Sequence, residues 1–177
     1  MNVEEIIALF DYDRWATERT LAAVSAVAEP DYLADRKSSH GGIHGTLVHL
    51  YGACVVWFSR WSGSSPAGFI RVSEIPSLDA LKERWTAHAA DLHAYLGTLT
   101  EETLAAPFSY ADLKGNRHAE PLYQQMQHSV NHASYHRGQV VTMLRQAGAT
   151  PANTDLIAYY RTRRTPPLRD TLERKNY

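Results

Sequence analysis

The chain has 177 residues, of which 44% are hydrophobic and 21% are charged, and its formal net charge is −1 with the histidines neutral. This is an ordinary composition for a folded domain, and it argues against a general nucleic-acid binder, which usually carries an excess of Lys and Arg. The one cysteine cannot form an internal disulfide, and no apolar run approaches the roughly 20 residues of a membrane span. We therefore expect a cytoplasmic protein whose partners include neither nucleic acid nor membrane.

Apolar residues recur at helical spacing in four long segments of the chain. We predict helices over residues 3–27, 42–61, 78–99 and 121–147. Pro30 marks the end of the first helix, and residues 31–40 are expected to form a polar linker. Ser77 is a suitable N-cap for the third helix, and Gly148 a suitable stop for the fourth. Because the connections look short, the pattern favours an up-down arrangement of the helices.

Smaller elements fill the rest of the chain. Thr100 can cap a short helical turn, and residues 108–118 alternate around a Lys114-Gly115-Asn116 turn, which predicts a small hairpin. We expect an all-α fold, an antiparallel four-helix bundle with this hairpin before the last long helix. The expected single domain covers residues 1–165, followed by a C-terminal tail at 166–177.

Histidine is the unusual residue of this chain, with nine copies. His128, His132 and His136 repeat every four residues on the fourth helix, so neighbours in this series lie one above the other on one face. Two imidazoles placed in this way can hold one metal ion. The outer two are about 12 Å apart along the helix, so all three cannot easily reach the same ion. A third ligand must come from another helix.

His49 is the best candidate for that ligand, because it stands inside the most apolar helix and metal sites in bundles are built from facing helices. The remaining histidines are expected at weaker positions. His88 and His93 are predicted at the surface, as is His44 unless it touches the mouth of the site. His40 and His118 are predicted in a loop or the hairpin, and His128 either beside the ligands or in a pocket, or otherwise in a packing or surface position. A zincin metalloprotease has its catalytic Glu directly after the first histidine of the pair. This chain has Ala133 at that position, which argues against metalloprotease chemistry.

The sequence resembles the DinB family, also known as the DinB/YfiT-like metalloenzymes. The matching segments are Asn131–Gln139, Leu144–Gly148, Ile43–His49 leading to Trp57, Tyr12–Ala16 and Asp155–Tyr159. The resemblance implies a four-helix bundle of up-down-down-up connectivity and a metal site formed by His49, His132 and His136. It also implies a homodimer, and some related branches are metal-dependent transferases that use a low-molecular-weight thiol.

Three neutral imidazoles leave a metal ion with an open position, which is the pattern of catalytic rather than structural zinc sites. Zinc is the default ion, and nickel or iron is compatible with imidazole ligands. We expect a metal-dependent thiol S-transferase that acts on a small electrophile, with a low-molecular-weight thiol as a second cofactor. The alternatives are a non-catalytic metal-binding or stress-response protein and a metal-dependent hydrolase. Cys54 is expected to be a packed hydrophobe rather than the reactive thiol.

Overall fold

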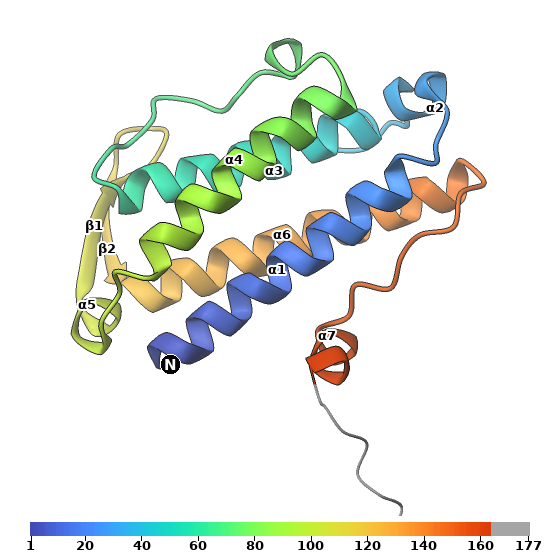
Figure 1. Cartoon of the computed structure of the whole chain (residues 1–177). Coiled ribbons are helices and arrows are strands. Elements are labelled where there is room, and N and C mark those ends of the chain that lie inside the picture. The colour runs from blue at the N-terminus through green and yellow to red at the C-terminus, as the bar shows by residue number, and fades with distance from the viewer. Residues whose placement is uncertain (164–177) are drawn as a thin grey trace, which may run out of the picture.

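Four long helices lie side by side in the computed structural model, which describes residues 1–163 (Figure 1). They are α1 (Val3–Val24), α3 (Ile43–Trp61), α4 (Leu78–Leu96) and α6 (Leu122–Gln146). The shorter helices are α2 (Glu29–Leu33), the 3-10 turn η1 (Val72–Glu74), α5 (Glu101–Ala105) and α7 (Leu156–Arg163). The strands β1 (Pro107–Ala111) and β2 (Arg117–Pro121) pair antiparallel. The predicted all-α class and the hairpin are confirmed, whereas the predicted tail at 166–177 lies outside the described residues.

The helix ends follow from local hydrogen bonding. At the start of α1 the Asn2 side chain accepts from the backbone N–H of Glu5, whose side chain in turn accepts from the Asn2 backbone N–H. The Ser77 hydroxyl accepts from the backbone N–H of Ala80, as predicted for an N-cap. After α6, Gly148 adopts a φ of +75°, a left-handed conformation that glycine tolerates best.

The segment after α1 differs from the expected linker. Residues Glu29–Leu33 form α2, with Pro30 in its first turn, where the missing N–H of proline has no cost. Pro30 therefore starts a helix instead of only ending the previous one. The short helix buries the side chain of Tyr32, whose hydroxyl shares a hydrogen bond of 2.6 Å with His44 Nδ1.

The directions of the long helices differ from a simple alternation. The connection over residues 62–77 returns along the molecule, so α3 and α4 run in the same direction, opposite to α1 and α6 (Figure 1). This is the up-down-down-up order that the family resemblance implies. The expectation of short connections was wrong for this segment, whose Gly, Ser and Pro residues were correctly read as a loop.

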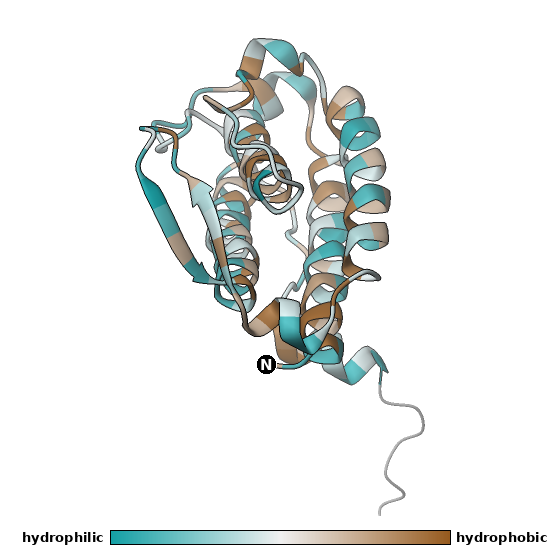
Figure 2. Ribbon diagram, turned by 90° about the vertical axis from the view of Figure 1, so that its left-hand side faces the viewer, coloured by the Kyte–Doolittle hydropathy of each residue, from teal (hydrophilic) through white to brown (hydrophobic). Residues whose placement is uncertain are grey.

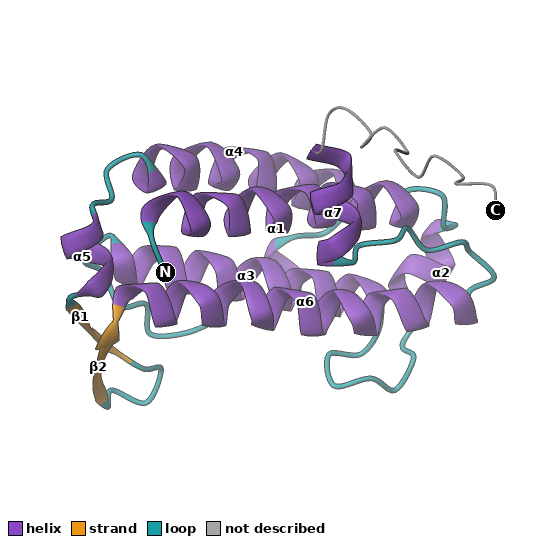
Figure 3. Cartoon of the chain, turned by 90° about the horizontal axis from the view of Figure 1, so that it is seen from below, coloured by secondary structure: helices purple, strands orange, loops and turns teal. Residues whose placement is uncertain are grey.

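The core lies between two pairs of helices, with α1 and α4 on one side and α3 and α6 on the other (Figure 3). Helix α6 packs against both α1 and α3, and each long helix carries hydrophobic as well as hydrophilic residues (Figure 2). The hairpin and α5 lie at one end of the helices and α2 at the opposite end (Figure 3). Within residues 1–163, no helix combines the length and the apolar character that crossing a membrane requires.

Candidate metal centre

Four histidines from three segments converge beside α3 and α6. His49 comes from α3, His132 and His136 from α6, and His40 from the loop that precedes α3. The ring of His49 lies with its centroid 4.6 Å from that of His136 and 5.4 Å from that of His132. The three sequence-predicted histidines are thus neighbours in space, although they come from distant parts of the chain.

The pair on α6 has the geometry of two ligands aimed at one point. The Nε2 atoms of His132 and His136 are 3.1 Å apart. Two nitrogens bound to one tetrahedral ion at 2.0–2.1 Å each would be separated by about 3.3 Å. Only a small adjustment of these side chains is needed for both nitrogens to share an ion.

Gln139 fixes the orientation of His136, which is 5% exposed. The Nδ1–H of His136 donates to Gln139 Oε1 over 2.8 Å, which directs Nε2 of the ring towards His132. A hydrogen bond from the second ring nitrogen is the usual support for a metal-binding histidine. This hydrogen bond lies within α6, because Gln139 follows His136 by three residues.

His49 is held by a helix that is buried on nearly all sides. Its ring lies 5.2 Å from the ring of Phe69, which comes from the long connection between α3 and α4. That connection passes close to α3 at Gly52, where an added Cβ would lie 3.5 Å from the Phe69 ring. The half-buried His49 imidazole therefore sits between α6 and an aromatic side chain.

His40 is the member of this cluster that the sequence analysis placed at a weaker position. Its ring stacks on that of His49, with centroids 3.7 Å apart, and the ligand nitrogens of His40, His49 and His136 all lie within 4.8 Å of one another. The available signal was the pair Gly41-Gly42, which allows a loop to approach a helix closely. Helical periodicity gives no information on residues outside helices, so it could not place His40.

Burial lowers the pKa of three imidazoles of this cluster, those of His40, His49 and His132. Burial, followed by repulsion from His40, His136 and His132, lowers the pKa of His49 to about 4. Burial, followed by repulsion from His136, His128 and His40, also lowers the pKa of His132 to about 4. Because a histidine must be unprotonated to bind a metal ion, these rings are ready to act as ligands at neutral pH.

Two histidines outside the cluster were wrongly predicted at the surface. His44 is buried against Tyr32 at the start of α3, and His88 is buried against Tyr51 and Phe58 of α3. The prediction failed because a polar residue on a helix was taken to face solvent, whereas both of these imidazoles pack against aromatic side chains. His93 and His118 are exposed as predicted.

His128 lies at the surface, which is one of the positions predicted for it. It is exposed, one helical turn before His132, and its ring lies 5.2 Å from that of Trp57. Its ring centroid is 5.9 Å from that of His132. His128 therefore borders the cluster without joining the closest group of ligand nitrogens.

Arg137, which follows His136 on α6, has a structural role. Arg137 is 2% exposed and donates to the Asp13 carboxylate and the Thr17 hydroxyl of α1. It ties α6 to α1. Burial is the largest single influence on the Arg137 guanidinium and lowers its pKa, but the charge and hydrogen bonding of Asp13 and Tyr12 together raise the pKa above its ordinary value, so the guanidinium stays charged.

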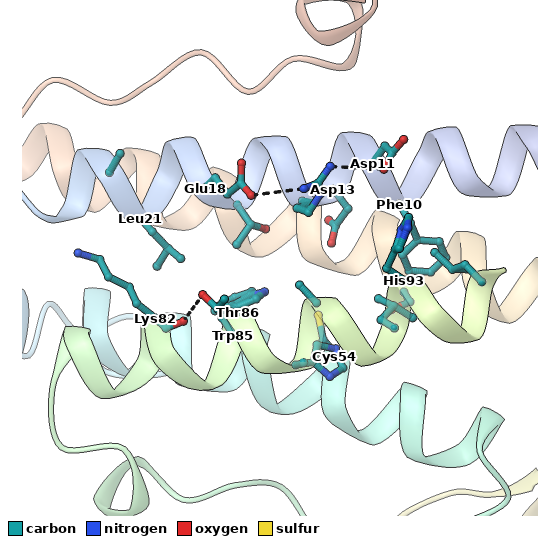
Figure 4. Close-up of a pocket in the computed structure, with 18 of the residues that line it drawn as sticks. Phe10, Asp11, Asp13, Glu18, Leu21, Cys54, Lys82, Trp85, Thr86 and His93 are labelled. Carbon is teal, nitrogen blue, oxygen red and sulfur yellow. Dashed lines mark hydrogen bonds and ion pairs between the residues drawn. The ribbon is translucent and has the colours of Figure 1, made fainter.

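A separate cavity of about 480 Å³ lies between α1 and α4 (Figure 4). Side chains of α1 such as Leu21 and of α4 such as Trp85 line it, together with Cys54 of α3. Burial raises the pKa of the Cys54 thiol, which supports the predicted packing role over a reactive one. None of the four clustered histidines is among the described residues that line this cavity.

Comparison with known proteins agrees with this arrangement. The chain is 26% identical over 161 residues to the protein DinB of Bacillus subtilis (strain 168), a match that covers 85% of this chain and 91% of that protein. The model of the DinB family matches residues 1–169. Since that match spans nearly the whole sequence, the chain belongs to the DinB family.

Proposed function

We propose that the protein binds one divalent metal ion through His49, His132 and His136 and uses it to transfer a small thiol onto an electrophile. The observation that carries the proposal is the convergence of these three imidazoles: the Nε2 atoms of His132 and His136 are 3.1 Å apart, and the His49 ring lies 4.6 Å from that of His136 and 5.4 Å from that of His132. Zinc is the ion proposed first, because imidazole and an incomplete set of protein ligands suit it; nickel or iron is compatible.

The donor set fits such an ion. Imidazole nitrogens are ordinary ligands of zinc, and the ring of His136 has the supporting hydrogen bond expected of a ligand. A bound divalent cation supplies positive charge that stabilises a thiolate at neutral pH. The residues of this chain hold the ion, orient the rings and shield one side of the locus with Phe69.

The choice of a thiol rather than water rests on the surroundings of the cluster. A hydrolase needs a general base near its metal-bound water, and α6 carries neither Asp nor Glu. The ligand-capable group found within residues 1–163 consists of histidines alone. Cys54 lines the other cavity, so the reacting sulfur is proposed to come from a soluble cofactor.

The remaining parts of the proposal concern the setting of this chemistry. We assign the helices to a DinB/YfiT-like four-helix bundle in a single domain over residues 1–165, located in the cytoplasm. A non-catalytic metal-binding or stress-response protein is the second candidate, since the same cluster could store or sense an ion without turnover.

The test is a screen of the metal-loaded protein with bacillithiol, mycothiol, glutathione and coenzyme A and a fluorogenic electrophile such as monochlorobimane. Consumption of one thiol should be faster with the wild-type protein than with His132→Ala. The matched control is His93→Ala, which removes an exposed histidine of α4 and should retain wild-type turnover. Equal rates for wild type and His132→Ala with all four thiols would favour the binding protein.

A further inference from the structure

His40 occupies an unusual place for a loop residue. Its imidazole lies face to face on that of His49, with ring planes inclined by 12°, and its centroid is 5.2 Å from that of His136. His132 lies beside His136 as well, at a centroid distance of 4.4 Å. The locus next to His49 and His136 is therefore bordered by two further imidazoles, one from α6 and one from the loop.

The loop is built to hold His40 against α3. The backbone N–H of Ser38 donates to the Gly41 carbonyl and the N–H of Gly41 to the Ser38 carbonyl, which closes a tight turn around His40. Gly41 has a φ of +80°, which L side chains rarely adopt. A Cβ on Gly45 of α3 would lie 2.0 Å from the His40 carbonyl oxygen, so this close approach requires glycine.

The imidazole of His40 has no partner that would explain this placement. Among the hydrogen bonds of residues 1–163, none involves either ring nitrogen of His40. The ring is half-buried and lies against the rings of His49 and His136. A side chain with an unused donor atom is held next to the proposed ligands His49 and His136.

We propose that His40 is an additional ligand of the metal ion, so that this site has four imidazole ligands in its resting state. The inference rests on the metal site of the proposed function and adds a residue to it. Two nitrogens bound to one tetrahedral ion at 2.0–2.1 Å each are about 3.3 Å apart. The nitrogens of His40, His49 and His136 lie within 4.8 Å of one another, so side-chain movements of about 1.5 Å or less bring them to that separation.

This assignment changes the character of the site. Four protein ligands are typical of closed zinc sites, whereas three ligands leave a position for substrate. A ligand from solution must then compete with His40, which is the one member of the set that comes from a loop rather than a helix. Strong ligands such as thiols can compete with an imidazole better than water can, which accords with the proposed thiol chemistry.

The experiment compares wild type with His40→Phe and His40→Ala after loading the full chain with Co²⁺. Phenylalanine retains a ring that can stack on His49 but has no nitrogen, so it separates ligation from stacking. Both variants should show a changed visible absorption spectrum of Co²⁺ and a loss of at least about tenfold in metal affinity, the smallest loss typical of disturbing even an outer partner of a ligand. Added imidazole should bind the Co²⁺ form of His40→Phe at lower concentration than it binds wild type.

His93→Ala serves as the control and should keep the wild-type spectrum, and far-UV circular dichroism of each variant checks that the helices are intact. A wild-type spectrum and affinity in His40→Phe would overturn the inference while leaving the proposed three-histidine site in place, and a loss in His40→Ala alone would then assign His40 to stacking. Absence of Co²⁺ and Zn²⁺ binding by the wild-type protein would overturn the proposed function together with the inference.

Discussion

At the scale of single residues, the histidines of this protein differ in their surroundings. His49 and His132 are neutral and close to other imidazoles, whereas His88 is 8% exposed and its Nε2 has no hydrogen-bond partner within the described residues. Burial lowers the pKa of His88 to about 4, against a weaker opposing effect of Asp91. His88 thus offers a measurable link between protonation and stability that does not involve the proposed metal site.

We expect His88→Leu to weaken the pH dependence of stability in the metal-free protein. In the folded state His88 resists protonation down to about pH 4, whereas in the unfolded chain it binds a proton below about 6.5. Stability therefore falls as pH drops from 6.5 towards 4, and His88 accounts for roughly 2–3 kcal/mol of that loss. Urea unfolding at pH 7 and pH 4.5 measures the effect; a variant that loses as much stability as wild type over this interval would contradict it.

At the scale of elements, the absence of a side chain at Gly45 allows the loop before α3 to lie close to that helix. Gly45 faces the carbonyl oxygen of His40, whereas Gly138 on α6 is exposed with no atom within 4 Å of an added Cβ. Both glycines lie within helices, so replacing either one by alanine should bring the same intrinsic gain in helix stability. They form a matched pair in which the surroundings alone differ.

Gly45→Ala should destabilise the metal-free protein by about 1–3 kcal/mol, because the new methyl group forces backbone atoms apart. Gly138→Ala should stabilise it by about 0.5–1 kcal/mol, the usual gain in an open helical position. Urea midpoints at pH 7 measure both. A shift of the two midpoints in the same direction would show that the loop does not rest on α3 in this way.

The long helices were predictable from sequence because each has a strong apolar period, and their bounds differ from prediction by a few residues at most. The ligand pair on α6 was predictable for the same reason, since helical spacing alone stacks His132 on His136. Helix α2 was missed because five residues give too short a period, and Pro30 signals either an end or a start. The positions of His40 and Phe69 depend on where loops return in space, which no local pattern encodes.

At the scale of the whole molecule, a cavity of about 480 Å³ separates parts of α1 and α4. The cavity there is lined largely by apolar side chains, among them Phe10, Leu92 and Leu96. Charged residues such as Lys82 and Glu18 also line it (Figure 4). An apolar centre with polar surroundings is typical of a protein interface.

We predict a homodimer, on the family resemblance and the aromatic residues of α1 and α4. Light scattering at micromolar concentration should give about twice the chain mass of 19.9 kDa. Ala89→Arg places a cation among the apolar side chains of this cavity and should shift the protein towards the monomer if the face is the interface. A clean particle of single-chain mass from the wild-type protein would contradict the dimer.

The central claim, that a cluster of histidines on α3 and α6 holds a metal ion, is tested most directly by metal content. Elemental analysis of purified wild-type protein should give close to one divalent ion per chain. His49→Ala, His132→Ala and His136→Ala should each lose most of it, while His93→Ala and His88→Leu should retain it. Equal metal content in all five variants, or none in the wild-type protein after incubation with Zn²⁺, would contradict the assignment.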